Sequence, residues 1–386
     1  MEFLGFQRKD GSVGIRNYVG IISAMDNVNP LARKIVENVQ GTVLISDLFG
    51  RKMMGTNHEM RVKALTGMGN NSNLGGVIVV SLHQPSAMSL AEPISASGKD
   101  VECIVFQELG SSLKCLEQGI RTAVKMVKKL SGVQRSAHPL SDLIIGVECG
   151  GSDFSSGISG NPALGNAADR LLDAGGTVVL SETGEIIGAE HILAKRSVSR
   201  EVADKVFKAV KEIENLARAA GVSDIRESNP AADNIKGGIT TLAEKALGAI
   251  KKAGNKPLKD VLGFCDAIPF RAPGFYFMST PAPACESMTG LAAGGAQLIV
   301  FNTGLGNPSA NPVTPTIKMT GNPYTVQISS DDIDIDVSDI ISNGVSIEDA
   351  GERIFKEIQN VANGKMTFSE IFGISQSTIS VVGASF

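Results

Sequence analysis

The sequence predicts an α/β protein made of parallel-sheet, three-layer, Rossmann-like domains. Short apolar runs rich in β-branched residues alternate along the chain with longer amphipathic stretches, which is typical of strand–helix–strand units. Several of these runs, such as residues 142–147, are apolar after their first residue and therefore indicate strands buried on both faces of a parallel sheet. Glycine, with 43 of 386 residues, can supply the tight turns between elements. We expect right-handed crossovers between the strands.

The chain is longer than one ordinary hydrophobic core, so more than one domain is expected. Residues 132–139 are polar and include Pro139, which predicts a boundary near residue 137. The division gives a first α/β domain at 1–137 and a second at 138–386, with a possible sub-boundary near residue 250.

The first domain is predicted to alternate strands with helices. The expected strands cover residues 18–23, 42–46, 76–81 and 101–106. The expected helices cover residues 30–39, 59–67, 86–97 and 116–130.

The second domain is predicted to continue this alternation. The expected strands cover residues 142–147, 176–181, 297–301 and a short C-terminal stretch near 378–382. The expected helices begin at Asn161-Pro162 and run to 173, then cover 189–195, 199–219 with Ser199 as N-cap, and 348–363. Acidic and apolar residues alternate over 331–339, which favours a half-buried edge strand.

The charge and cysteine patterns exclude several classes of protein. A net charge of −4 without a basic stripe argues against nucleic acid as a main partner. No apolar run reaches the ~20 residues that span a bilayer, so we expect a soluble, cytoplasmic protein. The five cysteines are scattered and odd in number, which favours reduced thiols over disulfides or a zinc knuckle, and Cys103 is expected in the core.

The densest group of reactive residues follows the strand predicted at 142–147. It reads Glu148-Cys-Gly-Gly-Ser-Asp153, and parallel sheets present ligand sites just past the carboxyl ends of their strands. The N–H groups at the helix start near Asn161 could bind an anion. The same stretch could also be a glycine-rich turn without a ligand, but the concentration of Glu, Cys, Ser and Asp favours a functional site.

Three later blocks could converge with this turn. Glu182-Thr-Gly-Glu185 follows a strand, and His191 comes shortly after it. Gly237-Gly238 precede Thr240, Thr241 and Lys245, which suggests either a carboxylate site or a plain capped helix; both interpretations stay open. Asn302-Thr303-Gly304 follows the strand predicted at 297–301.

The order of these blocks, with Arg8-x-Asp-Gly-x-Val-Gly-Ile-Arg16-Asn17 ahead of them, resembles the altronate and galactarate dehydratase family over nearly the whole chain. The resemblance implies loss of water β to a carboxylate from a sugar acid, giving a 2-keto-3-deoxy product, with help from a divalent metal, probably Fe²⁺ with Mn²⁺ or Mg²⁺ as alternatives. The large subunit of sulfolactate sulfo-lyase is a relative, so sulfite elimination is an alternative. Because the chain begins directly at the Arg-x-Asp-Gly block, we expect a small partner subunit, as well as a homo-oligomer and a small hydroxy acid as substrate.

The resemblance assigns roles to particular residues. Those expected in catalysis are Glu148, Cys149, Asp153, Glu182, Glu185 and Lys245. Those expected to bind substrate are Arg16, Asn17, Ser152, Asn161, Thr240, Thr241 and Thr303. Those expected to ligate the metal are Glu148, Asp153 and His191.

The chain departs from the family pattern in the first domain. Members commonly carry cysteines after the first three strands, where this chain has Ala24-Met-Asp26, Ser46-Asp-Leu-Phe-Gly-Arg51 and Ser81-Leu-His-Gln84. Cys149 alone cannot hold a cluster that needs three thiolates. Either oxygen and nitrogen ligands hold a harder ion, or the chemistry has changed, or the chain is a non-catalytic binding paralogue. A dinucleotide enzyme is disfavoured because no Gly-x-Gly-x-x-Gly follows the first strand.

Overall fold

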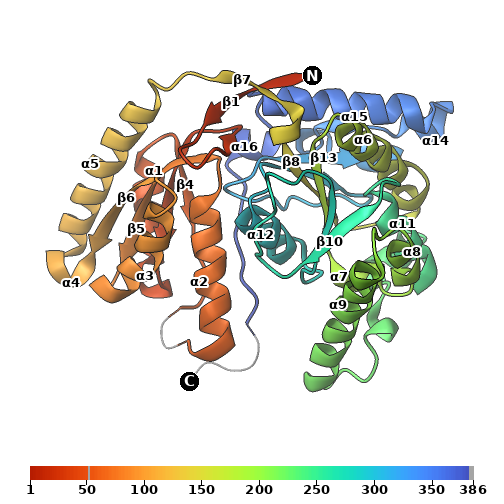
Figure 1. The fold of residues 1–386 in the computed structure, drawn as a ribbon, viewed down its shortest axis with the longest axis horizontal. Coiled ribbons are helices and arrows are strands. Elements are labelled where there is room, and N and C mark those ends of the chain that lie inside the picture. The colour runs from red at the N-terminus through yellow and green to blue at the C-terminus, as the bar shows by residue number, and fades with distance from the viewer. Residues whose placement is uncertain (51–52, 382–386) are drawn as a thin grey trace.

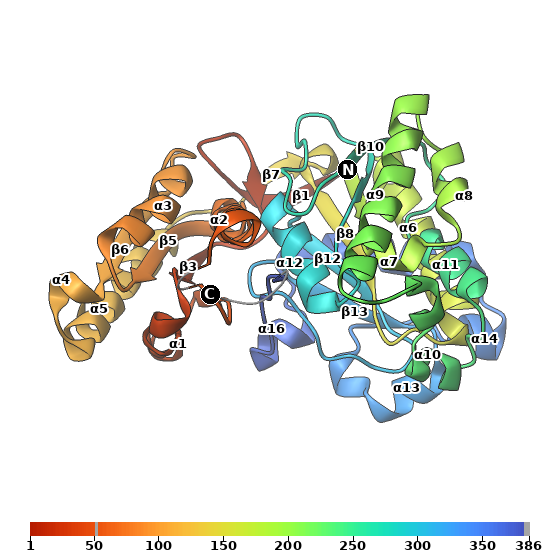
Figure 2. The ribbon, with the colours of Figure 1, turned by 90° about the horizontal axis from the view of Figure 1, so that it is seen from below.

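The computed structural model describes residues 1–50 and 53–381 and contains two parallel sheets and a small antiparallel one (Figure 1). Arg51, the last residue of one block that departs from the family pattern, lies outside the described residues. Seen from below, the N-terminal sheet with its helices and the larger C-terminal sheet with its helices form two lobes side by side (Figure 2). The α/β class expected from the sequence is confirmed.

The N-terminal lobe is built on a four-stranded parallel sheet with the order β4-β3-β5-β6. Its strands are β3 (Tyr18–Ser23), β4 (Thr42–Ile45), β5 (Leu74–Ser81) and β6 (Asp100–Val105). Its helices are α1 (Asn29–Asn38), α2 (Gly55–Asn70), α3 (Gln84–Ser95), α4 (Phe106–Leu109) and α5 (Ser112–Leu130). Apolar side chains on the two sheet faces enter separate clusters, one with α1 and α5 and one with α2 and α3, so three layers form.

The C-terminal lobe is built on a seven-stranded parallel sheet with the order β10-β11-β9-β8-β12-β13-β14. The central strand is β8, which pairs with its chain neighbour β9 on one side and with β12 on the other. The topological switch point therefore lies between β8 and β12, where ligands bind in open α/β sheets. The strands are β8 (Ile144–Cys149), β9 (Thr177–Leu180), β10 (Leu258–Leu262), β11 (Phe275–Met278), β12 (Leu298–Asn302), β13 (Thr316–Thr320) and β14 (Ile335–Asp336).

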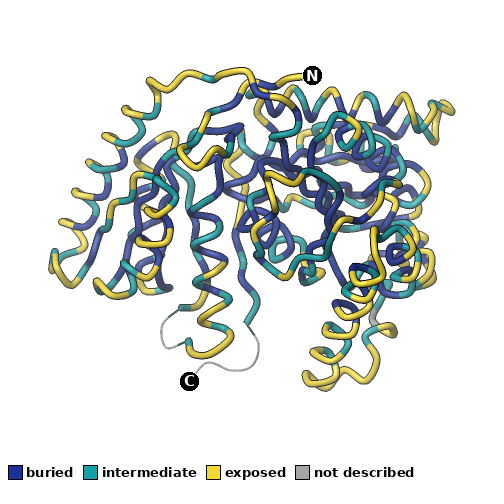
Figure 3. Tube along the Cα trace, in the orientation of Figure 1, coloured by how far each residue is buried: buried dark blue, intermediate teal, exposed yellow. Residues whose placement is uncertain are grey.

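Helices cover both faces of this sheet. Ile145 and Val147 of β8 face a cluster with α6, α9, α11 and α15, whereas Ile144 faces α12. The larger helices are α6 (Asn161–Asp173), α9 (Arg200–Ala219), α11 (Leu242–Lys251), α12 (Ala284–Gly294) and α15 (Ile347–Ala362). The shorter helices are α7 (Thr183–Ile186), α8 (Glu190–Lys195), α10 (Ala232–Lys236), α13 (Pro323–Ile328), α14 (Asp339–Asn343) and α16 (Phe368–Phe372). The buried residues, coloured dark blue in Figure 3, follow the strands of both lobes.

A small antiparallel sheet links the two lobes. Its strands are β1 (Glu2–Gln7), β2 (Val13–Gly14) and β7 (Ser136–Pro139). The boundary predicted near residue 137 falls inside β7, and the division into domains there stays a prediction.

Two local predictions need correction. Residues 378–381 form no strand, and 382 lies outside the described residues. This tail instead packs Ile379 into the N-terminal core and bonds its Thr378 N–H to Thr289, so burial without strand pairing explains its apolar pattern. Of the edge strand predicted at 331–339 only β14 forms, at the sheet edge; the rest is turn and short helix.

No helix among the described residues is long and apolar enough to cross a membrane.

Candidate active site at the carboxyl ends of β8 and β12

The candidate site lies at the switch point of the seven-stranded sheet. Glu148 and Cys149 are the last residues of β8, and they pair in register with Phe301 and Asn302 at the end of β12. Ser181 and Glu182 follow β9 directly, on the other side of β8. The parallel topology thus brings the residues at 148–153, 181–185 and 302–304 to one edge of the sheet, as the sequence predicted.

Glu148 is fully buried, and only one of its two carboxyl oxygens is hydrogen-bonded. Its Oε2 accepts hydrogen bonds from Ser181 Oγ at 2.5 Å and Ser287 Oγ at 2.8 Å, whereas its Oε1 has no partner among the described residues. Burial, with the charge of Glu182, raises the pKa of Glu148 well above its ordinary value. An unpaired carboxyl oxygen at the switch point is suited to meet a ligand or a water.

A lysine that the sequence did not single out lies at the centre of this site. Lys252 Nζ lies 3.0 Å from Cys149 Sγ and forms an ion pair with Glu182 Oε2. Glu182 Oε2 also accepts the backbone N–H of Cys149 at 3.0 Å. Since the Lys252 and Glu182 side chains are essentially inaccessible, each neutralises a charge that would be very costly alone.

The Cys149 thiol is protonated in this environment. Burial, with the charge of Glu182, raises its pKa to about 12 even though Lys252 and Lys245 act in the opposite direction. A neutral buried thiol is a poor nucleophile and a poor ligand for a soft metal.

Glu182 has a strained backbone. Its φ is 67°, in the left-handed region that residues with side chains seldom adopt, and its N–H donates to Thr280 Oγ1 at 2.7 Å. Thr280 in turn bonds Ser287, which also holds Glu148. One hydrogen-bonded chain therefore links the backbone of Glu182 to the carboxylate of Glu148.

A second ion pair lies beside the first. Lys245 Nζ is 2.9 Å from Glu185 Oε2 and donates to Asn234 Oδ1 at 3.3 Å, while Asn234 Nδ2 donates to the carbonyl of Ser152. Burial lowers the pKa of Lys245, but Glu185 and Cys149 outweigh this effect and raise it overall. Burial raises the pKa of Glu185 against the opposing charge of Lys245.

A cavity of about 270 Å³ opens onto these groups. Cys149, Ser152 and Lys245 line it, and the Ser152 hydroxyl is buried without a hydrogen-bond partner among the described residues. A cavity of this size, at the lower end of the range for ligand pockets, suits a small molecule.

Asp153 has a structural role. Its Oδ1 accepts from Ser155 Oγ at 2.6 Å and from both the N–H and the hydroxyl of Ser156, while its Oδ2 accepts from Asn322 Nδ2 at 2.6 Å. The helix predicted over 161–173 is confirmed as α6, but helical backbone already begins at Phe154 behind this carboxylate, so the N–H of Asn161 is not free to bind an anion. The Asn161 N–H bonds to the carbonyl of Ser156, at the end of a π-helical turn over Ser156–Gly160.

The remaining predicted threonines are held by local bonds. Thr241 Oγ1 accepts the N–H of Glu244, and the Glu244 carboxylate accepts the N–H of Thr240, so of the two open interpretations the capped helix describes these two residues. Thr303 Oγ1 accepts the N–H of Gly306 and closes the turn after β12. Lys245, one turn into the same helix, lines the cavity, whereas Thr240 and Thr241 do not.

Comparison with protein families agrees with this arrangement. Residues 140–385 match the model of the D-galactarate/altronate dehydratase C-terminal domain, and residues 5–131 match the second domain of D-galactarate dehydratase/altronate hydrolase. The chain belongs to the D-galactarate/altronate dehydratase family.

Three curated members of this family illustrate its range. The chain is 34% identical to the (2R)-sulfolactate sulfo-lyase subunit beta of Chromohalobacter salexigens, over 96% of this chain and 95% of that protein. It is 31% identical to the altronate dehydratase of Escherichia coli, over 95% of this chain and 74% of that protein. It is also 31% identical to the galactarate dehydratase of Escherichia coli, over 96% of this chain and 75% of that protein.

Two residues that the family resemblance assigned to substrate lie elsewhere. All five guanidinium N–H groups of Arg16 are used, two by Glu370 and the others by backbone carbonyls. Asn17 accepts from Arg8 and donates to the carbonyl of Leu130. Arg16 therefore has no donor left for a substrate carboxylate, and both residues join segments of the fold.

The three expected metal ligands of this dehydratase-family chain do not converge. His191 is exposed on α8, Asp153 has both oxygens occupied, and Glu148 is buried next to Ser181 and Ser287. Within residues 1–50 and 53–381, no group of three or more His, Cys, Asp or Glu side chains is arranged to hold a metal ion. These residues do not fit the implied ion, which stays a prediction from the family resemblance.

Several functional side chains escaped the sequence reasoning. Lys252 follows Lys251 and looks like part of a solvated helix end, although its spacing of seven from Lys245 places both on the buried face of α11. That spacing was the one available signal. Ser287 and Thr280 come from segments with no motif, and only the fold brings them to Glu148 and Glu182.

Proposed function

We propose that this chain is a lyase that eliminates a β leaving group from a small 2-hydroxy carboxylate, with a sugar acid such as altronate or galactarate as the first candidate. Family membership supports the reaction class. The observation that carries the proposal is the pair of buried lysine–carboxylate contacts, Lys245–Glu185 and Lys252–Glu182, beside a small cavity at the switch point.

The reaction needs a base, a stabilised negative charge and an acid. The C2–H bond breaks and its proton goes to the base, the electron pair forms the C2–C3 double bond, and the C3–O bond breaks. The leaving hydroxide takes a proton and departs as water, and the enol product tautomerises to the 2-keto-3-deoxy acid. Charge develops on the substrate carboxylate as C2 loses its proton, so a fixed cation there lowers the barrier.

We assign these tasks to residues that line the cavity or contact its lining. Lys245 is protonated and lines the cavity, so it can pair with the substrate carboxylate and its growing charge. Glu185, whose pKa is raised, lies 2.9 Å from Lys245 and is the proposed base. Glu182 and Lys252 contact Cys149, which lines the cavity, and so hold its wall in place. Ser152 lines the cavity with an unpaired hydroxyl, whereas Glu148 lies outside the lining.

Sulfite elimination from sulfolactate is the second candidate. It is favoured by one observation: the chain aligns with 95% of the sulfo-lyase subunit but with only about three quarters of the dehydratases. Because that relative is a subunit beta, we also propose that this chain works with a smaller partner subunit.

No step above depends on the implied divalent metal, and its contribution is tested by assays with and without chelator.

The deciding experiment incubates the purified chain, alone and with any subunit that copurifies, with altronate, galactarate and (2R)-sulfolactate. A 2-keto-3-deoxy acid supports the first candidate, and sulfite supports the second. Glu185→Gln, which keeps the size of the side chain, should lower kcat by at least a hundredfold. Binding of the acids without any product would favour the non-catalytic paralogue.

A further inference from the structure

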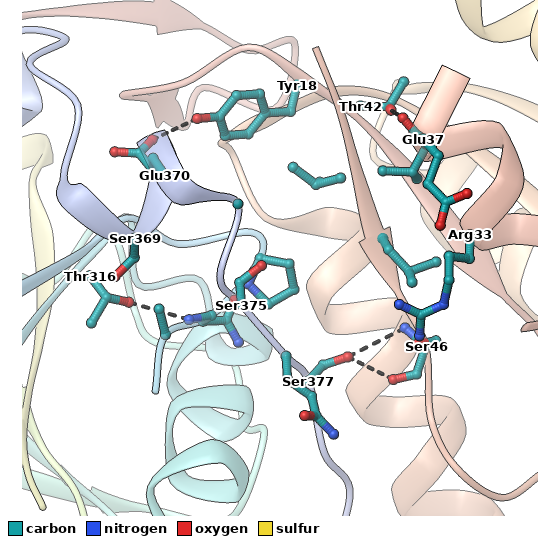
Figure 4. Close-up of a pocket in the computed structure, with 18 of the residues that line it drawn as sticks. Tyr18, Arg33, Glu37, Thr42, Ser46, Thr316, Ser369, Glu370, Ser375 and Ser377 are labelled. Carbon is teal, nitrogen blue, oxygen red and sulfur yellow. Dashed lines mark hydrogen bonds between the residues drawn. The ribbon is translucent and has the colours of Figure 1, made fainter. Parts of the chain in front are cut away.

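A second and larger cleft lies between the two lobes, with a volume of about 780 Å³. One wall comes from α1 and β4 of the N-terminal lobe, and the other comes from residues 310–316 and 366–377 of the C-terminal lobe (Figure 4). Figure 4 shows side chains from both lobes around this space, including Arg33 and Ser46 on one side and Thr316 and Ser369 on the other. Neither the family resemblance nor the proposed chemistry uses this cleft.

Unsatisfied polar atoms gather in the walls of this cleft. Asn311 Nδ2, Ser369 Oγ and Asn29 Oδ1 are buried and have no hydrogen-bond partner among the described residues, and all three side chains line the cleft. Asn311 and Ser369 are each only 5% exposed. Leaving a buried donor or acceptor unpaired costs about 1–3 kcal/mol, so three in one cleft call for a partner.

The orientation of the Asn311 amide is fixed. Its Oδ1 accepts the backbone N–H groups of Val313 at 2.9 Å and Thr314 at 3.3 Å, which only the carbonyl end can do. The unpaired atom is therefore the amide nitrogen, a hydrogen-bond donor. Asn29 Nδ2 donates to the carbonyl of Asp47, which leaves its oxygen as an acceptor.

The charges around the cleft leave one cation unpaired. Glu370 is neutralised by Arg16, Asp47 by Arg61, and Glu37 by Lys34. Arg33 lines the same cleft and is exposed, and it makes no ion pair or hydrogen bond with any residue that the structure describes. A ligand that carries a carboxylate would supply the missing partner.

The walls of the cleft are held in place without a ligand. Ser377 Oγ donates to the carbonyl of Ser46 at 2.7 Å and accepts its N–H at 3.3 Å, which ties the C-terminal segment to β4. Glu370 accepts from Tyr18 Oη at 2.6 Å, near the upper end of the cleft in Figure 4. A site formed in advance spares a ligand the cost of ordering it.

We infer that this cleft binds a small polyhydroxylated carboxylate, with the carboxylate at Arg33 and the hydroxyl groups at Asn311, Ser369 and Asn29. Hydroxyl groups both donate and accept, so they match a wall that offers an unpaired amide donor, an unpaired amide acceptor and an unpaired hydroxyl. The loop that begins with Thr303 at the candidate active site reaches the cleft at Asn311, so one segment of the chain borders both sites.

Calorimetry with galactarate, and with the uncharged polyol galactitol as control, tests the inference on the full chain. The wild type should bind galactarate at the cleft and at the cavity near Lys245, and galactitol should bind at least tenfold more weakly at the cleft. Asn311→Asp keeps the oxygen that caps Val313 and Thr314 but replaces the unpaired donor with a negative charge. It should weaken the cleft site at least tenfold, as should Arg33→Gln, which changes an exposed side chain. Arg121→Gln, on exposed α5, is the matched control and should change nothing.

The outcomes separate this site from the proposed catalytic one. If Lys245→Met loses one binding event and Asn311→Asp loses the other, both sites exist. If only Asn311→Asp and Arg33→Gln lose binding, the cleft site stands and the assignment of the cavity fails. If galactarate binds the wild type, Asn311→Asp and Arg33→Gln with equal affinity and stoichiometry, the inference is overturned. No binding by the folded wild type overturns it as well.

Discussion

Lys252 Nζ lies 3.0 Å from Cys149 Sγ, and the lysine also forms an ion pair with Glu182 in a site that solvent does not reach. The lysine comes directly after α11, Cys149 ends β8, and Glu182 comes shortly after the neighbouring strand β9. The ammonium therefore supplies a fixed positive charge at the point where the ends of these strands meet. It also ties α11, which carries Lys245, to the sheet.

Lys252→Met should destabilise the protein strongly. It leaves the Glu182 carboxylate buried without its counter-charge, and breaking such a pair typically costs about 3–5 kcal/mol. Urea unfolding of the variant measures the loss. Lys251→Met, at the neighbouring exposed position, is the matched control and should change the free energy of unfolding by less than about 0.5 kcal/mol. Equal losses in both variants would contradict a special role for Lys252.

Cys149 should resist alkylation in the folded protein. Its pKa is raised to about 12, so almost no thiolate exists at pH 8, and the side chain is buried. Iodoacetamide at pH 8 followed by peptide mass spectrometry should find Cys149 unmodified and the partly exposed Cys285 modified, with both modified after unfolding in urea. Rapid labelling of native Cys149 would be incompatible with this environment.

The same thiol makes stability depend on alkaline pH. The unfolded thiol ionises near its ordinary pKa of about 8.5, whereas the folded thiol stays protonated up to about 12. Its contribution is therefore complete below pH 8.5 and is lost as the pH rises toward 12, because the unfolded state releases its proton first. Cys149→Ala should reduce the slope of unfolding free energy against pH over this range.

Arg16→Lys should lower stability and leave substrate affinity unchanged. The lysine ammonium is a single point charge. It cannot replace the five N–H donors with which Arg16 binds Glu370 and three backbone carbonyls. We expect a loss of about 2–4 kcal/mol in urea unfolding. KM for whichever acid is turned over should stay within twofold; a large rise in KM would restore the substrate-binding role that the sequence suggested.

Gly304→Ala should disrupt the turn after β12. A Cβ atom at this position would lie 2.0 Å from Asp153 Oδ1, and that carboxylate cannot move because Ser155, Ser156 and Asn322 hold it. We expect destabilisation of more than about 2 kcal/mol or failure to fold. Gly157→Ala, where the nearest atom is 4.0 Å away, should be tolerated.

The sequence predicted the fold well because many of its strands are largely apolar runs and its longer helices are mostly amphipathic. Tyr18–Ser23, for example, is the strand that the pattern predicts. It also located Glu148 and Cys149, since reactive residues after a buried strand fall at a sheet edge. The helix at 161–173 was predicted, but the helical turn over 154–160 before it was not, because Pro162 suggested a first turn whereas the Asp153 carboxylate caps the chain earlier.

The sequence could not predict which side chains contact each other when segments far apart in the chain pack together. Arg16 resembles a substrate-binding arginine until Glu370, at the other end of the chain, is placed against it. Lys252 is hidden in a run of two lysines, and Asn311 stands in a loop without a motif. Each of these residues has a role that depends on segments brought together only by folding.

Thr241→Ala and Lys245→Met should separate the structural and functional parts of the segment after Gly238. Thr241 caps α11 through the N–H of Glu244, so its loss should cost about 1 kcal/mol in unfolding free energy and leave kcat within twofold. Lys245 lines the cavity beside Glu185, so Lys245→Met should lower kcat/KM by at least a hundredfold while the chain stays folded at 25 °C, as circular dichroism can verify. If both variants lose turnover in proportion to their loss of stability, Lys245 is a structural residue and the carboxylate is bound elsewhere.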